Sequence, residues 1–288
     1  MKQIRRRGFV IVGLAAIAAV SFGISRRVLG QKRLRFPYLN SSLAASEYAA
    51  LAAKPAWSAS QIVVAPGISL NGLVRRPKHT NAPWVLFYQG NDANMLRVGQ
   101  SFLTGLAAER DWGLAIYAYR GYDSSAGEPH LTDLAADAPE IITQLCSVEH
   151  IERSQVHIVG FSIGGHLAVR AMAVAASLRP KPASLTLLAP VNDISMVRHS
   201  FFERLDAGDD FKTDPFLDAI PAPVLVIQGT ADEALLGPEQ GRAIATKLGT
   251  RAHYVELPNV GHIALLSSET VFATVREFIS EHSEENKS

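Results

Sequence analysis

The chain has 288 residues, of which 48% are hydrophobic and 19% are charged, an ordinary composition for a globular protein. Its 28 basic and 27 acidic side chains nearly balance, and the basic ones do not gather on one segment of the body, so nothing indicates a nucleic-acid partner. The single cysteine, Cys146, excludes an internal disulfide and a thiolate metal cluster.

The N-terminal segment differs from the rest of the chain. An uncharged, largely apolar stretch at 8–25 lies between two clusters of basic residues, at 2–7 and 26–35. Arginines at both ends suit a membrane interface better than a buried helix of the fold. We expect residues 1–30 to be an uncleaved membrane anchor, and an export signal removed by cleavage is the alternative. The flanking charges leave the orientation open, and we place the body on the periplasmic or external side.

The segment 31–60 is predicted to be a linker with a short alanine-rich helix at 43–53. From residue 61 onward, strand-like and helix-like segments alternate. The predicted strands are 61–65, 70–75, 84–88, 113–119, 156–161, 184–189, 224–228 and 252–257. The predicted helices are 94–110, 131–147, 163–178, 238–248 and 269–284.

This alternation predicts an α/β domain over 61–288, with a mostly parallel sheet of eight strands flanked by helices. Several strands are continuous apolar runs, as expected for strands buried on both faces. The segment 194–220 interrupts the alternation of strands and helices, because it is richer in charged residues and carries several phenylalanines. We expect either a small cap over an active site or one or two surface helices there.

The strongest chemical signal is the motif Gly160-Phe161-Ser162-Ile163-Gly164, which lies between a predicted strand and an alanine-rich helix. A sharp strand-to-helix turn needs small neighbours around a strained serine, and the N-terminus of the helix favours developing negative charge. The motif therefore predicts that Ser162 is a nucleophile. A tight turn in which Ser162 only caps the helix is the competing interpretation.

A serine hydroxyl needs a base, and in sites of this kind the acid and the histidine follow later in the chain. The strand at 224–228 runs into a loop with Asp232, and the last strand runs into a loop with His262. We predict that His262 takes the serine proton and that Asp232 orients its ring. Rival acids are Glu233 and Asp193, and rival histidines are His166, His199 and His253.

Backbone N–H groups should stabilise the oxyanion. One donor is expected from Ile163, directly after the nucleophile. The second should come from the loop that follows the strand at 84–88, most naturally from Asn91 and otherwise from Gly90. A plain Gly-Asn turn is the alternative.

These motifs together resemble the α/β-hydrolase superfamily over residues 61–279. Within it the chain is similar to membrane-associated or secreted esterase-like hydrolases and serine aminopeptidase-like proteins. Their H-G-N-A-G-N oxyanion loop corresponds to residues 89–94 here, and their Y-R-G-Y-G-x-S-x-G loop to residues 119–127. This chain has Gln89 where the family commonly has histidine and Asp123 where it commonly has glycine. Arg120 and Asp123 are expected to brace these loops.

The expected function is that of a serine hydrolase, carboxylesterase- or lipase-like, which cleaves carboxylic esters or thioesters through an acyl-enzyme on Ser162. A serine peptidase with the same triad is one alternative, and a binding protein that retains the fold without catalysis is another. We expect a small ester or acyl substrate and no metal or organic cofactor. The oligomeric state stays open. A peptidase that selects a free amine would need acidic residues in the cap, for which Glu203, Asp206, Asp209 and Asp210 are available.

Overall fold

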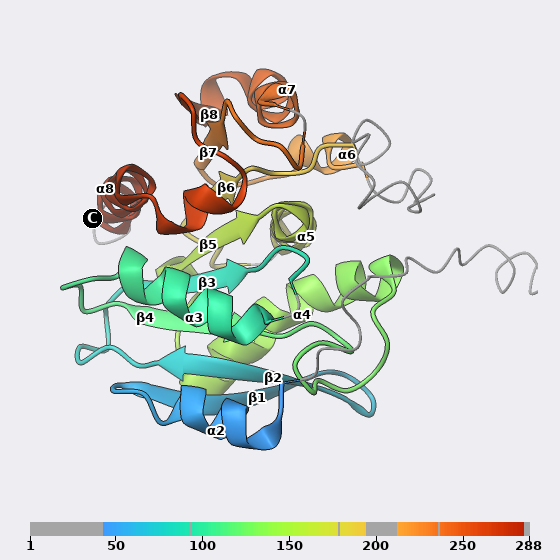
Figure 1. Cartoon of the computed structure of the whole chain (residues 1–288), viewed down its shortest axis with the longest axis vertical. Coiled ribbons are helices and arrows are strands. Elements are labelled where there is room, and N and C mark those ends of the chain that lie inside the picture. Colours follow the sequence, from blue (N-terminus) through green and yellow to red (C-terminus); the bar gives the residue numbers. More distant parts are fainter. Residues whose placement is uncertain (1–42, 93, 178, 194–211, 236, 285–288) are drawn as a thin grey trace, which may run out of the picture. The chain divides into compact units, whose positions relative to one another are not determined.

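Eight strands form one sheet, with helices packed on both of its faces (Figure 1). The structure is a computed structural model that describes residues 43–92, 94–177, 179–193, 212–235 and 237–284. The strands are β1 (Trp57–Ala65), β2 (Ile68–Arg75), β3 (Trp84–Tyr88), β4 (Gly113–Tyr117), β5 (Val156–Phe161), β6 (Ser184–Leu188), β7 (Val224–Gly229) and β8 (Ala252–Leu257).

Most helices connect consecutive strands. The α-helices are α2 (Ala45–Ala52), α3 (Met95–Leu106), α4 (Leu131–Glu149), α5 (Ile163–Ala175), α6 (Asp214–Leu217), α7 (Glu239–Leu248) and α8 (Glu269–Glu284). Short 3₁₀ turns are η1 (Arg153–Gln155), η4 (Gly249–Arg251) and η5 (Ile263–Ser267).

The order of strands creates a switch point in the middle of the sheet. The order is β1-β2-β4-β3-β5-β6-β7-β8, in which β2 pairs antiparallel with β1 and β4, and all pairs from β4 to β8 are parallel. From β3 the chain moves to one side, to β4, and then returns to β5 on the other side. Right-handed crossovers in opposite directions put α3 and α5 on opposite faces. The loops after β3 and β5 therefore meet at the carboxyl edge, where α/β sheets bind ligands.

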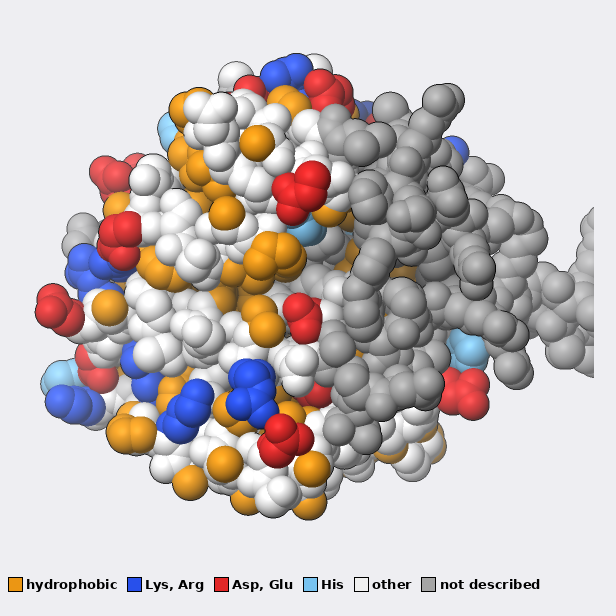
Figure 2. All heavy atoms as spheres, viewed as in Figure 1, with side chains coloured by type: hydrophobic (Ala, Val, Ile, Leu, Met, Phe, Trp, Pro, Cys, Tyr) orange, Lys and Arg blue, Asp and Glu red, His pale blue; other side chains and the backbone are white. Residues whose placement is uncertain are grey.

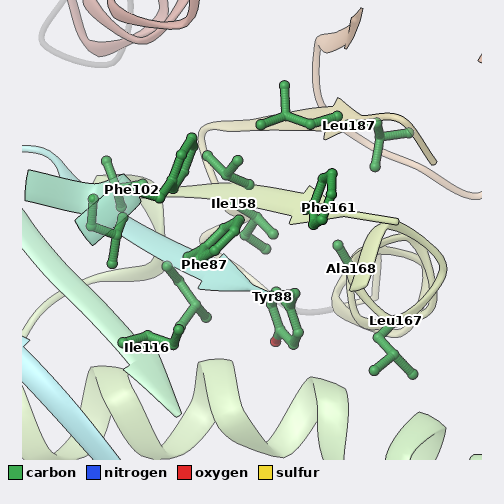
Figure 3. Close-up of a cluster of buried hydrophobic side chains, with 14 of the residues drawn as sticks. Phe87, Tyr88, Phe102, Ile116, Ile158, Phe161, Leu167, Ala168 and Leu187 are labelled. Carbon is green, nitrogen blue, oxygen red and sulfur yellow. The ribbon is translucent and has the colours of Figure 1, made fainter. Parts of the chain in front are cut away.

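The central strands are buried along their whole length because helices cover both faces. Every residue of β3, β4, β5, β6 and β7 is buried, whereas the edge strand β8 is mostly half-buried. Figure 3 shows Phe87 of β3 and Phe102 of α3 in one cluster, with ring centroids 4.5 Å apart. The same cluster reaches Phe161 at the end of β5 and Leu167 of α5, so the core extends to the turn that carries Ser162.

The predicted fold class is confirmed, and the differences lie at the ends of elements. β1 begins at Trp57 and not at residue 61, so the sheet starts inside the stretch predicted as linker and helix. The small side chains of Ser58, Ala59 and Ser60 give the first part of β1 no apolar pattern, although Trp57 and Ser60 are buried there. The helix predicted at 43–53 is α2, Ala45–Ala52.

Two predictions fall largely outside the described residues. The first is the N-terminal anchor at 1–30. The second is the cap at 194–220, of which only residues 212–220, with α6, are described. Within the described part of the chain, none of the helices combines the length and apolar character that a bilayer span requires.

Candidate active site

Ser162 lies at the sharp turn between β5 and α5, at the carboxyl edge of the sheet. Its backbone has φ 55° and ψ −123°, a left-handed conformation that costs free energy in a residue other than glycine. Its N–H donates to the carbonyl oxygen of Leu188 in β6 at 3.0 Å, and its own carbonyl oxygen accepts from the N–H of Gly165 at 3.0 Å. The strained turn is therefore held by the neighbouring strand and by the first turn of α5.

The two glycines of the motif are required by close packing at this turn. A methyl group on Gly160 would lie 2.7 Å from the carbonyl oxygen of Gly164. A methyl group on Gly164 would overlap the backbone carbonyl of Tyr88, at the end of β3. Because these obstacles are backbone atoms, no side-chain movement could relieve them. The spacing of the motif thus has a direct steric reason, which is that α5 begins against the end of β3.

Asp232 and His262 are in direct contact. Asp232 follows β7 and His262 follows β8, and the aspartate Oδ2 lies 2.8 Å from the histidine Nδ1. Both residues are buried, with exposed fractions of 2% and 6%, and Ser162 is exposed by only 4%. The ring of His262 packs against that of Phe161, with centroids 4.7 Å apart, beside the turn of Ser162. The structure thus brings the three predicted residues to one edge of the sheet, and their catalytic roles stay predictions.

The carboxylate of Asp232 is fully occupied by donors. Its Oδ1 accepts from the backbone N–H groups of Ala234 and Leu235, at 3.0 and 2.8 Å, and its Oδ2 accepts from the Gln228 side-chain amide at 2.8 Å. The remaining contact of this carboxylate is the one between Oδ2 and His262 Nδ1. Since an ionised carboxylate can only accept hydrogen bonds, His262 must carry its ring proton on Nδ1. The lone pair of Nε2 is then left for a proton from a hydroxyl.

Sequence reasoning missed Gln228. It follows the apolar run Val224–Ile227 within β7 and is completely buried. A buried amide must find hydrogen-bond partners, so a polar residue in an otherwise apolar strand next to the predicted acid was the available signal.

Glu233 also contributes, although not as the acid. Its Oε2 accepts from the backbone N–H of His262 at 3.1 Å, so it holds the loop that carries the histidine.

The rival histidines and the rival acid Asp193 do not compete for these roles where the structure describes them. His166 of α5 is buried, and its Nδ1 lies 3.0 Å from the Thr213 hydroxyl. Burial, and secondarily the charge of Arg170, lowers the pKa of His166 to about 3. His253 is an exposed residue of β8, and the backbone N–H of Asp193 is held by Gln240 at 2.9 Å. His199 lies outside the described residues.

Within the predicted oxyanion segment, residues 89–94, Gly90 lies directly against the nucleophile turn. A methyl group on Gly90 would lie 3.1 Å from the Ser162 Cβ and 2.9 Å from the Phe161 ring. Asn91 is anchored by its side chain, whose Oδ1 accepts from the Tyr122 hydroxyl at 2.8 Å. Ile163 is the first residue of α5, where backbone N–H groups have no partner within the helix. The roles of Ile163, Asn91 and Gly90 as donors stay predictions.

The loop at 119–127 braces this segment. The Tyr119 hydroxyl donates to the carbonyl oxygen of Gln89 at 2.8 Å. Arg120 makes two bonds to the carboxylate of Asp137 in α4, at 2.5 and 2.6 Å, so it holds the loop against a helix. Asp123 accepts from the backbone N–H of Leu96. The expectation that Arg120 and Asp123 brace these loops agrees with these contacts.

Apolar surface lies next to the histidine. Figure 2 shows hydrophobic side chains gathered near the middle of the face on which α3 and η5 lie. In η5, Ile263 directly follows His262 and is 58% exposed. Among the described residues, no group of three or more His, Cys, Asp or Glu side chains is arranged to hold a metal ion.

Comparison with solved structures identifies the fold. The chain superposes on an esterase of Pyrococcus furiosus with a TM-score of 0.59 at 13% identity, over 79% of this chain and 91% of the other. For the proline iminopeptidase of Mycobacterium smegmatis the TM-score is 0.60 at 16% identity, over 80% and 100% of the two chains. The chain has the α/β-hydrolase fold. At these identities the likeness shows the fold alone.

The sequence is also similar to two known proteins over part or most of its length. The human alpha/beta hydrolase domain-containing protein 17B is 30% identical over 155 residues, which are 54% of this chain and 52% of the relative. An uncharacterized protein of Mycobacterium tuberculosis is 27% identical over 279 residues, which cover 93% of this chain and 94% of the relative. No protein-family model matches the chain.

Proposed function

We propose that this α/β-hydrolase is a serine hydrolase that cleaves carboxylic esters or thioesters through an acyl-enzyme on Ser162. The observation that carries the proposal is the buried bond between His262 Nδ1 and Asp232 Oδ2, beside a serine held in a strained turn. A serine that only capped a helix would need neither the positive φ nor a histidine oriented by a buried carboxylate.

The proposed chemistry follows from the protonation state of the histidine. The Ser162 Oγ attacks the carbonyl carbon while its proton passes to Nε2 of His262. The tetrahedral oxyanion is stabilised by backbone N–H groups of Ile163 and of Asn91 or Gly90. The bond to the leaving oxygen or sulfur then breaks, and His262 gives its proton to that atom. Water, deprotonated by the same nitrogen, attacks the acyl-enzyme and releases the carboxylic acid and Ser162.

The surroundings of the site favour a substrate with an apolar acyl group. The ring of Phe161 packs on His262, and the exposed Ile263 follows it, so apolar surface flanks the proposed base. Transfer of acyl methylenes onto such surface contributes about 0.8 kcal/mol each when fully buried.

A chain-length series of p-nitrophenyl esters tests this proposal on the full chain. We expect hydrolysis of acetate, butyrate and octanoate esters by the wild type, and a loss of at least about a thousandfold in Ser162→Ala. Ser177→Ala, which changes an exposed serine away from the site, should keep wild-type rates. Hydrolysis of aminoacyl p-nitroanilides in preference to esters would favour the peptidase. Equal ester hydrolysis by Ser162→Ala would refute the nucleophile assignment.

We also propose that the N-terminal residues hold the protein at a membrane, on the strength of the apolar stretch at 8–25 and its basic flanks. Fractionation of cells that express the full chain, with intact mass of the purified protein, tests this. The anchor predicts a full-length chain in the membrane fraction. A chain shortened by roughly its first 15 to 30 residues and found outside that fraction would show a cleaved signal, as the length of export signals implies.

A further inference from the structure

Two adjacent side chains, Tyr122 and Asp123, each hold a residue of the chain that follows β3. Both are buried, with exposed fractions of 3% and 1%. The Tyr122 hydroxyl donates to Asn91 Oδ1 at 2.8 Å, and Asp123 Oδ2 accepts from the backbone N–H of Leu96 at 2.7 Å. Asn91, from which a backbone donor is proposed, and Leu96 in the first turn of α3 are therefore each held by one of the two adjacent side chains.

The Tyr122–Asp123 pair is itself rigidly supported. The carbonyl oxygen of Asp123 accepts from the Asn71 side-chain amide at 3.3 Å, and Asp123 has φ 42°. The Ser125 hydroxyl accepts from the Asn71 backbone N–H at 2.9 Å and donates to the carbonyl oxygen of Ala118 at 2.9 Å. Because these bonds tie the loop to β2 and to the end of β4, a shift of residues 91–96 relative to Asp123 would break the bond to Leu96.

We propose that Asp123 is a positioning residue for the oxyanion segment, which it holds through the first turn of α3 when it is ionised. The inference rests on the proposed hydrolase function. The bond to Leu96 is charge-assisted and lies at a helix N-terminus, where a negative charge is favoured. A neutral acid accepts a weaker bond. The hold on the segment therefore depends on the charge of a carboxyl group that has almost no contact with water.

The groups around Asp123 make this charge depend on pH in the working range. Burial raises the pKa of Asp123 to about 6, and the nearby carboxylates of Asp92 and Glu47 act in the same direction. The bond from the Leu96 N–H and the charge of Arg97 act against this rise. Among the described residues, Asp123 Oδ1 has no hydrogen-bond partner, as expected where the charge is costly. Turnover should therefore lose a positioning contribution as the pH falls through 6.

The pH dependence of kcat for p-nitrophenyl butyrate between pH 4.5 and 8.5 tests this proposal. The wild type should show an ionisation near pH 6 on the acid side of the profile. Asp123→Asn, whose amide oxygen can accept from Leu96 but cannot ionise, should lose it. Asp123→Gly removes the anchor and tolerates the positive φ. We expect it to lower kcat about tenfold at pH 8 with little change in KM, since a displaced donor costs less than the hundredfold or more of a removed one.

Tyr122→Phe should lower kcat while keeping the ionisation near pH 6, because it loosens the clamp without removing the titrating group. A wild-type acid limb in Asp123→Asn, together with unchanged kcat in Asp123→Gly, would overturn the positioning role.

Failure of the hydrolase proposal is distinguishable, because the wild type would then hydrolyse no ester at all. The ionisation of Asp123 can still be read in that case from thermal unfolding. The raised pKa of Asp123 contributes a fall in stability as the pH rises from about 4 to 6, which opposes the rise that the lowered pKa values of His157 and His166 contribute. Asp123→Asn removes the opposing contribution, so its stability should rise more steeply with pH than that of the wild type. An equal slope in the two proteins would overturn the titration of Asp123.

Discussion

Asp232→Asn is the most informative single substitution at the site. Asp232 Oδ1 accepts two backbone N–H groups, from Ala234 and Leu235, and only an oxygen can replace it there. The asparagine oxygen should therefore take the Oδ1 position, and its NH₂ group should face His262 Nδ1 in place of Oδ2. Nδ1 must then accept, so the ring proton moves to Nε2 and the histidine can no longer take a proton from Ser162.

The structure also indicates that the fold tolerates this change. Gln228 donates to Asp232 Oδ2, and rotation of its amide by half a turn would present an oxygen to the new NH₂ group. The Gln228 side-chain oxygen has no hydrogen-bond partner among the described residues, so the rotation breaks no hydrogen bond of that oxygen. Thermal stability should stay close to that of the wild type, which separates a catalytic effect from unfolding.

We expect kcat for p-nitrophenyl butyrate to fall by about 10⁴-fold in Asp232→Asn, as when the wrong histidine tautomer is imposed on such a triad. This corresponds to roughly 5 kcal/mol of lost transition-state stabilisation. The matched controls Asp193→Asn and Glu233→Gln change the two rival acids and should each cost less than about tenfold, because neither side chain accepts the bond from Nδ1. A folded Asp232→Asn protein with kcat within tenfold of the wild type would refute this reasoning.

Three further substitutions test the packing and electrostatics around the site. Gly164→Ala should destabilise the fold by about 3 kcal/mol in urea unfolding, since the added methyl group meets the Tyr88 carbonyl, and wild-type stability would contradict the steric account. Gln228→Met should lower kcat several-fold with little loss of stability. Burial, and secondarily the charge of His282, lowers the pKa of His157 to about 3. The neutral ring of His157 therefore contributes its full stability above pH 6.5, the ordinary pKa of the group in the unfolded chain. This contribution is lost as the pH falls toward 3, by up to about 1.4 kcal/mol per pH unit. His157→Gln should flatten this decline in urea unfolding, whereas the exposed His253→Gln should not.

The sheet could be predicted from the sequence because its central strands are almost entirely apolar. Runs such as Trp84–Tyr88 and Val224–Ile227 have no other common structural meaning at that length, and they coincide with β3 and β7 closely. The turn of Ser162 could be predicted because the sharp turn itself requires Gly160 and Gly164, which flank the serine in the sequence motif. β1 was placed too late because its first residues are small and its edge position leaves alternate residues exposed.

The support of the site could not be predicted in the same way. Tyr122 and Asn91 are 31 residues apart, and nothing local in either segment indicates that they bond. The same holds for Asp123 and Leu96, whose contact depends on the placement of β4 beside β3. Asp232 and His262 were predictable only because their strands end at one edge, which follows from the fold and not from their neighbours in the sequence.

The reaction of the full chain with a fluorophosphonate shows directly whether Ser162 is an activated nucleophile. The reagent phosphonylates a serine whose hydroxyl is activated by a histidine, and intact-mass and peptide analysis locates the adduct. We expect one adduct per chain, on Ser162. Ser162→Ala should give no adduct, and Asp232→Asn should be labelled much more slowly than the wild type. No adduct on the folded wild type, or equal labelling of Ser162→Ala, would contradict this expectation.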